Sequence, residues 1–371
     1  MKRTLLILLT ILILLCGCAA EPTEIQPAPT PTPIPDPPAL TMAKAMTTEE
    51  KVGQLFLVQH PIYTPIEELQ ACHLGGFLFF GYDFANDTIE SMSAKIASYQ
   101  AASSIPMLMA VDEEGGDVVR VSCHKQYRST PFPSLRKLYD KGGIDAVLNT
   151  ETEKCALLQS VGINLNMSPV CDITNKWGTF MRSRSLGQDA ETTAEVISQI
   201  VTLMNGQQMG SVLKHFPGYG DNMDTHTGIA TDSRPLVELE QKDLIPFRAG
   251  INAGCGAVLM SHTVVTCLDE EYPVSLSPAA HAYLRNELGF EGVIITDDLA
   301  MDAITDTYSA GEAAVLAVLA GNDILCTSEY IEQYEAVLAA AQSGRISDAL
   351  LTDAVARVLQ WKMDLGLISV E

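Results

Sequence analysis

The sequence predicts an α/β protein with a single catalytic domain folded as a TIM-type (β/α)8 barrel. Eight short apolar runs typical of buried parallel strands recur along the chain, and longer helical stretches lie between most of them. This alternation continues from about residue 40 without a second linker or a block of like charge. The first run leads into "VQHPIY", which lacks the glycine-rich phosphate turn common in open doubly wound sheets. The closed barrel is therefore favoured over the open sheet.

The individual elements follow from local patterns. A helix should begin at Thr47, because Thr47 and Glu50 have the spacing of a capping box. Further helices are expected over 189–206 and 309–321, and a last one over 347–366, where apolar residues recur every three or four positions before Gly366. The strands are expected at 52–58, 75–80, 106–111, 162–170, 211–216, 256–262, 292–298 and 322–327.

The N-terminal segment is read as a targeting sequence. Two basic residues precede an apolar run that is too short to span a bilayer but suits a secretory signal. The run ends in "LCGC", which resembles a bacterial lipobox with lipid attached to Cys18; an ordinary signal peptide is the alternative. We expect a lipoprotein signal peptide over 1–17, the lipidated cysteine with a proline-rich linker over 18–39, and the barrel domain over 40–371. The protein would then lie in the cell envelope, outside the cytoplasm, and be lipid-anchored to the membrane.

Composition excludes several partners and cofactors. The formal net charge of −23 would repel phosphates, so no nucleic acid is expected as a partner. The nine cysteines show no CxxC spacing, so neither a zinc site nor a cysteine nucleophile is supported, and no pair can be assigned as a disulfide. We expect no metal and no cofactor.

Polar residues end several of the apolar strands, where a TIM barrel carries its reactive groups. They are Asp112, Lys214, His215, His262, Asp297 and Asp298. Polar side chains there are costly unless they are paired or used, so this many indicate a polar pocket. Asp112 and Arg120 also flank the glycine turn of "DEEGGDVVR" and would either clamp ligand hydroxyls or pair with each other.

The segment "VLKHFPGYGDNMDTHTG" (212–228) contains an Asp-x-His pair, Asp224 and His226, between glycines. A histidine can give and take a proton near neutral pH, and a neighbouring aspartate can orient its ring. The glycines suggest a loop that moves over bound ligand. Without the other motifs, the alternatives are that the two residues cap a helix or bind each other on the surface.

Five segments together resemble the successive motifs of glycoside hydrolase family 3. They are "MTTEEKVGQLFLV", "VDEEGGDVVR", "RSRSLG", "KHFPGYGDNMDTHTG" and "YPVSLSP…LRNELGFEGVIITDDLAM", in the family's order from about residue 44 to the end. The Asp-x-His element is typical of the β-N-acetylglucosaminidase branch. The resemblance implies a retaining exo-β-N-acetylhexosaminidase that releases terminal β-linked N-acetylglucosamine from cell-wall fragments, including muropeptides, or from other glycans.

The resemblance also implies roles for particular residues. Asp297 would be the nucleophile. His226 would be the proton donor and acceptor, assisted by Asp224; a loop-borne histidine is the economical choice because no room remains for the separate domain that supplies this group in many family members. The sugar-binding positions would be Asp112, Arg120, Arg184, Lys214 and His215.

Two departures from the family pattern leave the exact substrate open. Tyr219 stands where the family usually has a histidine, and Asp117 where it usually has an arginine. The alternatives are a β-glucosidase, β-xylosidase or phosphorylase of the same family, or a non-catalytic sugar-binding lipoprotein. Trp177 and Tyr219 would either stack on sugar or pack within the protein.

Overall fold

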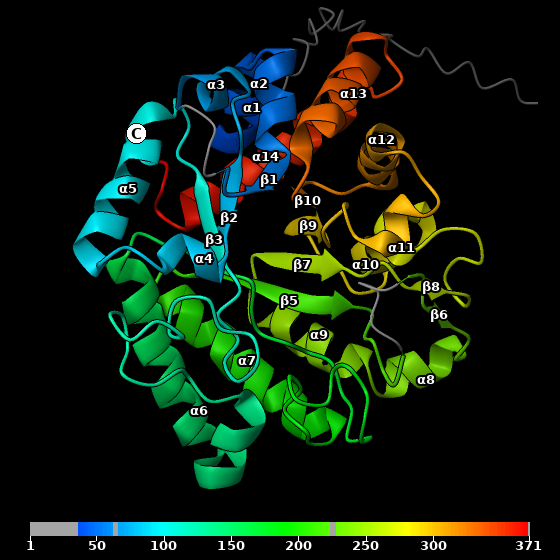
Figure 1. Cartoon of the computed structure of the whole chain (residues 1–371). Coiled ribbons are helices and arrows are strands. Elements are labelled where there is room, and N and C mark those ends of the chain that lie inside the picture. Colours follow the sequence, from blue (N-terminus) through cyan, green and yellow to red (C-terminus); the bar gives the residue numbers. More distant parts are fainter. Residues whose placement is uncertain (1–35, 62–65, 223–227, 370–371) are drawn as a thin grey trace, which may run out of the picture. The chain divides into compact units, whose positions relative to one another are not determined.

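A computed structural model describes residues 36–61, 66–222 and 228–369, which lie within one compact unit, Asp36–Glu371. Its main sheet has eight strands in the order β10-β1-β2-β3-β4-β5-β7-β9, and each neighbouring pair is parallel. A parallel bridge between Ile295 and Ile324 joins the two edges and closes the ring. Figure 1 shows the strands at the centre with helices around them. The predicted (β/α)8 barrel is confirmed.

Each predicted apolar run overlaps one barrel strand. The first predicted strand began too early, because helix α2 continues to Gln54. The predicted strand at 162–170 was too long, because β4 comprises only Leu165–Asn166. A separate two-stranded sheet of β6 and β8 was not predicted. The strands are β1 Phe56–Gln59, β2 Gly76–Phe79, β3 Leu108–Val111, β4 Leu165–Asn166, β5 Gly210–Phe216, β6 Thr231–Asp232, β7 Ala257–Met260, β8 Val264–Val265, β9 Val293–Thr296 and β10 Leu325–Thr327.

The helices alternate with these strands. They are α1 Pro38–Ala45, α2 Thr48–Gln54, α3 Ile66–Ala71, α4 Gly81–Phe84, α5 Ile89–Ala102, α6 Leu135–Ser160, α7 Ala190–Gly206, α8 Leu236–Gln241, α9 Leu244–Asn252, α10 Pro278–Asn286, α11 Asp302–Thr305, α12 Ala310–Ala320, α13 Tyr330–Gln342 and α14 Asp348–Asp364. A short 3-10 turn, Val274–Leu276, precedes α10.

Local capping explains where several helices begin. The capping box of α2 is present: Thr47 Oγ1 accepts from Glu50 N, and Glu50 Oε2 accepts from Thr47 N at 2.8 Å. Asp189 and Ser347 cap α7 and α14 through the backbone amides three residues on. The first helix, α1, begins at Pro38, inside the segment expected to be linker up to residue 39, and proline suits the first turn of a helix.

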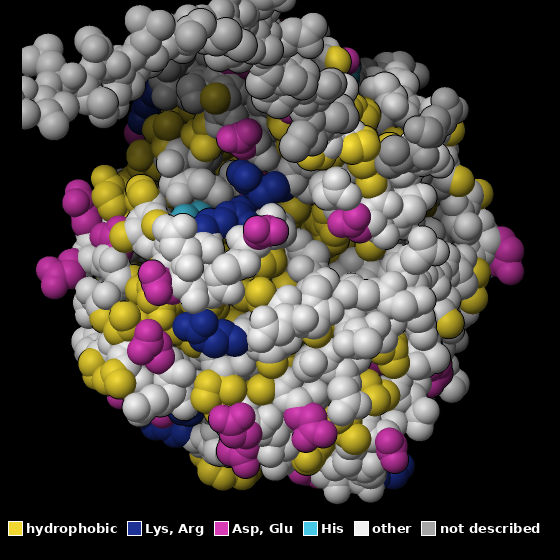
Figure 2. Space-filling model, turned by 180° about the vertical axis from the view of Figure 1, so that it is seen from behind, with side chains coloured by type: hydrophobic (Ala, Val, Ile, Leu, Met, Phe, Trp, Pro, Cys, Tyr) yellow, Lys and Arg dark blue, Asp and Glu magenta, His cyan; other side chains and the backbone are white. Residues whose placement is uncertain are grey.

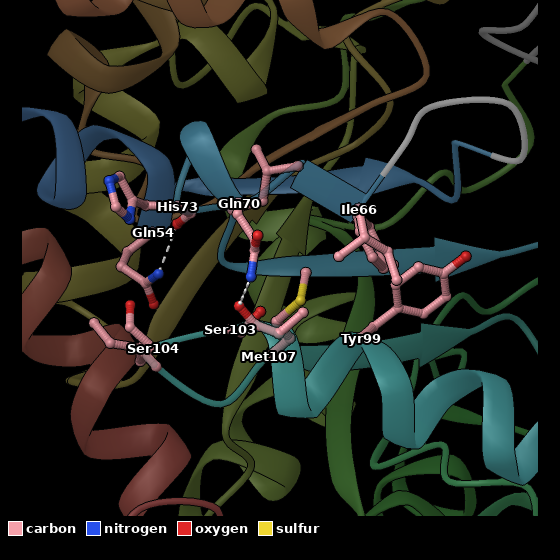
Figure 3. A pocket seen from close by; sticks show the side chains of 12 residues that line it. Gln54, Ile66, Gln70, His73, Tyr99, Ser103, Ser104 and Met107 are labelled. Carbon is pink, nitrogen blue, oxygen red and sulfur yellow. Dashed lines mark hydrogen bonds between the residues drawn. The ribbon is translucent and has the colours of Figure 1, made fainter. Parts of the chain in front are cut away.

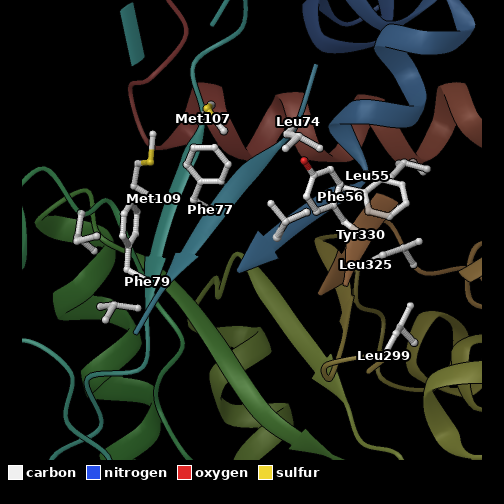
Figure 4. Packing of buried hydrophobic residues seen from close by; sticks show 14 of the residues in the cluster. Leu55, Phe56, Leu74, Phe77, Phe79, Met107, Met109, Leu299, Leu325 and Tyr330 are labelled. Atoms are coloured by element: carbon white, nitrogen blue, oxygen red, sulfur yellow. The ribbon is translucent and has the colours of Figure 1, made fainter. Parts of the chain in front are cut away.

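Alternation along the strands divides the core into two layers. The outer layer packs between the strands and the helices, and Figure 4 shows Phe56, Phe77, Phe79 and Leu325 within it. The inner layer fills the barrel, as expected for a packed TIM barrel and not a pore. It contains Leu57, Leu78, Leu108, Ala110, Leu165, Met167, Val212, Ala257, Leu259, Val293, Ile295, Ile324 and Cys326.

Helix α14 closes the N-terminal end of the barrel. Trp361 packs with the inner layer, and it approaches Gly256, just before β7, so closely that a Cβ at this glycine would overlap the indole. The next residue, Lys362, is completely buried, and its Nζ donates to Gln54 Oε1 at 2.7 Å. Burial lowers the pKa of Lys362 to about 7, because the charged form loses its hydration.

None of the helices in the described segments is both long and apolar enough to cross a lipid bilayer. The face drawn in Figure 2 carries scattered acidic side chains and only small groups of basic ones, in keeping with the negative net charge. The seven cysteines from Cys72 to Cys326 are free thiols.

Candidate active site

A cavity of about 640 Å³ opens at the C-terminal ends of the barrel strands. Asp112 directly follows β3, and Asp297 directly follows β9. Six of the residues predicted for the site line this cavity: Asp112, Arg120, Arg184, Lys214, His215 and Asp297. Asp224, His226 and Cys18 lie outside the described residues. The barrel thus brings together side chains that are far apart in the sequence.

Strand β5 supplies two consecutive residues to the cavity. Side chains in a regular strand alternate between faces, so Lys214 and His215 would normally point to opposite sides. The pairing of β5 with β7 shifts register between Leu213 and Phe216. Both Lys214 and His215 line the cavity beside this irregularity.

Four charged side chains form a balanced cluster at the cavity, three of them in its wall and Glu114 behind them. Lys214 Nζ lies 2.5 Å from Asp112 Oδ1 and 2.7 Å from Glu114 Oε1. Arg184 binds Glu114 through two parallel contacts, Nε to Oε2 at 2.9 Å and Nη2 to Oε1 at 2.6 Å. The cluster therefore pairs two cations with two carboxylates.

The cluster also sets the charge of its members. Burial raises the pKa of the Glu114 carboxyl, but Lys214 and Arg184 lower it by more, so that it lies well below its usual range. Burial lowers the pKa of Lys214, but Asp112 and Glu114 outweigh this effect and leave it raised. Lys214 and Glu114 are therefore both charged near neutral pH, and Lys214 can donate to a ligand oxygen.

His215 is held between an aspartate and an arginine. Its Nδ1 lies 2.8 Å from Asp172 Oδ2, and its Nε2 lies 3.2 Å from Arg184 Nη2. Asp172 also accepts from the backbone N–H groups of His215 and Tyr219. Asp172 is buried in the loop after β4 and fixes both the ring of His215 and the start of the following turn.

Asp297 leads into a tightly bonded turn. Its backbone N–H donates to Met260 O at 3.1 Å, and its Oδ1 accepts from Asp298 N at 3.0 Å. Asp298 Oδ1 accepts from the backbone of Ala300 and Ser328, so Asp298 orders the turn. His262 is buried, and its Nε2 donates to the Asp298 carbonyl at 2.9 Å.

The glycine turn after β3 places Arg120 in the cavity without pairing it to Asp112. Asp112 binds Lys214 instead, and the Arg120 Nε has no hydrogen-bond partner among the described residues. Gly115 has a φ of +103°, and a Cβ there would overlap the carbonyl of Pro133, so the tight turn requires glycine. Asp117, at the exposed tip of this turn, also lines the cavity.

The two aromatic residues proposed for sugar stacking differ in their surroundings. Tyr219 is buried, and its ring packs edge-on against His215 with centroids 5.3 Å apart while still forming part of the cavity wall. Trp177 is 82% exposed, lies outside the set of described residues that line the cavity, and has the Arg182 guanidinium 3.5 Å above its ring. Tyr219 therefore packs within the protein, and Trp177 lies on the surface.

The loop that carries Asp224 and His226 is described only at its two ends. Gly218 and Gly220 both have positive φ, and a Cβ at either would crowd a side chain, that of Asp243 or Arg234 respectively. Arg234 in turn pairs with Asp243 and Asp232, each at 2.7 Å. The glycines after β5 are thus required by close packing as well as by backbone conformation.

A second cavity, of about 180 Å³, lies away from this cluster (Figure 3). Its lining residues include Gln54, Leu74 and Met107, which precede β1, β2 and β3, so it is at the N-terminal side of these strands. Gln54 donates to His73 O and Gln70 to Ala102 O, so both amides are already bound to backbone. Since TIM barrels place their active sites at the other end, this cavity is not the catalytic one.

Two residues of the site, Glu114 and Asp172, were missed by the sequence reasoning. Asp172 follows the apolar run at 162–170 closely, so the rule that identified Asp112 would have found it if the residues just beyond the strand had been included. Glu114 lies two residues beyond Asp112 and carries no such signal; only the approach of Lys214 and Arg184 reveals its role. Within the described ranges, no group of His, Cys, Asp or Glu is arranged to hold a metal ion.

Comparison with known proteins identifies similar sequences and structures. Residues 47–361 match the family described as "Glycosyl hydrolase family 3 N terminal domain". A beta-hexosaminidase of Stenotrophomonas maltophilia (strain K279a) is 34% identical over 306 residues, which are 79% of this chain and 88% of that protein.

Solved structures agree with the sequence comparison. A glycoside hydrolase family 3 β-N-acetylglucosaminidase from Paenibacillus sp. str. FPU-7 is 30% identical with a TM-score of 0.81, over 88% of this chain and 65% of that one, so this chain spans slightly less than two thirds of it. A β-N-acetylhexosaminidase from Beutenbergia cavernae is 28% identical with a TM-score of 0.77, over 86% of this chain and 99% of that one.

Proposed function

The chain belongs to glycoside hydrolase family 3, and from this premise we propose that it is a retaining exo-β-N-acetylhexosaminidase. The observation that carries the proposal is the cavity in which Asp297 lies with Asp112, Lys214 and Arg184, the last two held by Glu114. A nucleophilic carboxylate beside fixed donors and acceptors suits the reacting carbon and the hydroxyls of a pyranose. The names of the relatives support an acetamido sugar as the substrate.

In the proposed mechanism Asp297 attacks the anomeric carbon. The bond from this carbon to the leaving oxygen breaks, and His226 gives that oxygen a proton; the sugar is then held as an ester on Asp297. His226 next takes a proton from water, which attacks the same carbon and frees Asp297. Asp224 orients the histidine and stabilises its charged form.

The cluster holds the sugar during both steps. Lys214 and Arg184 supply donors, Asp112 supplies an acceptor, and His215 and Arg120 line the same cavity. Because most of these side chains are already paired with one another, binding requires little reorganisation. We assign these five residues to sugar binding.

The position of the protein in the cell is a further part of the proposal. The apolar run and the "LCGC" sequence support processing before Cys18 and attachment of lipid to it. The enzyme would then act outside the cytoplasmic membrane in the cell envelope, where fragments of peptidoglycan that end in N-acetylglucosamine are available as substrates.

The test is turnover by the full-length protein of nitrophenyl β-N-acetylglucosaminide and β-glucoside, each with and without phosphate. We expect release from the acetamido sugar alone, independent of phosphate. Asp297→Asn should lower kcat on the order of 10⁴-fold or more, as expected when a catalytic nucleophile is removed. Asp302→Asn is the matched control, since Asp302 is an exposed carboxylate at the start of α11.

Other outcomes would replace the proposal with a specific alternative. Preference for the glucoside would indicate a β-glucosidase, and dependence on phosphate would indicate a phosphorylase. No turnover of either substrate, combined with measurable binding of N-acetylglucosamine, would indicate a sugar-binding protein.

A further inference from the structure

We propose that Asp172 is a positioning residue for His215: its carboxylate keeps the imidazole proton on Nδ1, so that Nε2 remains a hydrogen-bond acceptor in the sugar-binding cavity. This inference rests on the proposed function, because it gives His215 a defined role in holding Arg184, one of the residues proposed to bind the sugar. It concerns a residue that touches the site only through another side chain.

The contacts of Asp172 are all with donors. Oδ2 lies 2.8 Å from His215 Nδ1 and 3.1 Å from the His215 backbone nitrogen, and Oδ1 lies 2.7 Å from the Tyr219 backbone nitrogen. Asp172 is only 1% exposed, so water does not supply these contacts. Both oxygens of a carboxylate can accept, and this site needs both.

The other side of the ring imposes the same choice of tautomer. Arg184 Nη2 lies 3.2 Å from His215 Nε2, and a guanidinium nitrogen can only donate. Nε2 must therefore present its lone pair, which places the ring proton on Nδ1, facing Asp172. His215 Nε2 thus accepts from Arg184 and helps to hold this guanidinium at the cavity, where Arg184 is proposed to bind the sugar.

The same arrangement leaves His215 unsuited to donate a proton from Nε2. The cavity holds more than one candidate acid or base. The fixed tautomer of His215 assigns this residue to binding and not to proton transfer. The proton shuttle is left to the Asp224–His226 pair, and the position of the proton on His215 serves recognition of the sugar alone.

A second buried aspartate–histidine pair provides a control within the same chain. His60 Nδ1 lies 2.7 Å from Asp83 Oδ1, and His60 Nε2 lies 2.8 Å from the Tyr99 hydroxyl. A hydroxyl can either donate or accept, so the Tyr99 side of this ring tolerates either tautomer, and only Asp83 places the proton on Nδ1. His60 packs against Phe79 in the outer layer and does not line the catalytic cavity.

The two pairs predict opposite responses to substitution by asparagine, which has one acceptor oxygen and one donor nitrogen. In Asp83→Asn, the new amide can donate to His60 Nδ1, and the proton moves to Nε2 toward the Tyr99 hydroxyl. In Asp172→Asn, the amide nitrogen is a donor, and it must face either the Tyr219 N–H or the two donors of His215. One donor then opposes another in either orientation. If the His215 proton moves instead, Nε2–H faces the Arg184 donor.

The experiment compares full-length wild type, Asp172→Asn and Asp83→Asn. We expect Asp172→Asn to lower kcat/KM by about 10- to 100-fold, the range for losing a hydrogen bond to a charged group, mostly through KM. Inhibition by N-acetylglucosamine should weaken in parallel. Asp83→Asn should leave all these constants unchanged. Nitrogen NMR of histidine labelled with ¹⁵N should show His215 protonated on Nδ1 in the wild type and a change of state only in Asp172→Asn.

Specific results would overturn the proposal. They are a wild-type His215 with its proton on Nε2, an Asp172→Asn variant with wild-type kcat/KM and inhibition, or equal loss of kcat/KM in both variants, which would indicate a general loss of folding. Absence of turnover in the wild type would reject the proposed function, and the NMR comparison would then decide the positioning role by itself.

Discussion

Glu114 shows what a single buried carboxylate does in this cavity. It accepts from Lys214 and from two nitrogens of Arg184, so it holds both cations toward the space where the sugar is proposed to bind. Removing one partner of a buried pair typically costs about 3–5 kcal/mol, because the other charge is left uncompensated. The site thus depends on a residue that does not itself line the cavity.

Lys362 is the opposite case, a buried lysine that donates to the neutral amide of Gln54. Its pKa is about 7 in the folded protein, against an ordinary value of 10.5. Between these values the unfolded chain binds one more proton at this residue than the folded chain does. Stability therefore rises with pH across this window, by up to about 1.4 kcal/mol per pH unit.

We predict that Lys362→Met removes this contribution. The difference in unfolding free energy between wild type and variant should change between pH 7 and pH 10. The wild type should become more stable relative to the variant as pH rises. Urea unfolding at several pH values measures it. Lys141→Met, at an exposed position of α6, is the control and should show a constant difference from wild type. A constant difference for Lys362→Met as well would contradict the prediction.

At the scale of elements, helix α14 packs closely against the N-terminal end of the barrel because two glycines there have no side chain. Trp361 comes close enough to Gly256 that no Cβ fits between them, and it also lies 3.3 Å from the Cβ position of Gly210. These glycines precede β7 and begin β5, the strand that carries Lys214 and His215. Helix α14 therefore packs against the start of the strand whose other end supplies two cavity residues.

We predict that Gly256→Ala destabilises the protein by about 1–3 kcal/mol, because the added methyl group would force Trp361 or the start of β7 to shift. Gly206→Ala is the matched control: a Cβ at the end of α7 meets nothing within 4 Å, so this variant should be equal to the wild type or more stable by roughly 0.5–1 kcal/mol. Chemical denaturation of both variants measures the effect. Equal stability of Gly256→Ala and wild type would show that the indole can move without cost.

The boundaries of helices and strands show which features can be predicted from residues close together in the sequence. The start of α2 followed from Thr47 and Glu50, because a capping box involves residues only three apart. The end of β4 did not follow from its apolar run, and β6 and β8 were missed, because a two-residue ladder depends on a partner distant in sequence. Local chemistry determines where helices begin, and long-range pairing determines where short strands lie.

For the whole molecule, the main open prediction concerns attachment to the membrane. The formal net charge of −23 would repel anionic lipid, and we propose that the attachment is made by lipid at Cys18. In bacteria supplied with radioactive palmitate, the full-length protein should become labelled. Cys18→Ala should abolish labelling, whereas Cys16→Ala, two residues earlier, should not. Label retained in Cys18→Ala would reject the anchor at this position.

The sequence by itself determined the order of strands and helices, the barrel class and the residue types available for catalysis, because these depend on periodicity, capping and composition along the chain. It also predicted that the residues ending β3, β5 and β9 would meet, because a parallel barrel gathers the ends of its strands.

Only the tertiary structure decided which of these residues pair. Lys214 binds Asp112 across 102 residues of sequence, and Arg184 binds Glu114 across 70. The register shift in β5 brings two neighbouring side chains into one cavity, and His215 lies between Asp172 and Arg184. Such contacts depend on atoms approaching to about 3 Å, and no local pattern in the chain specifies distances between segments so far apart.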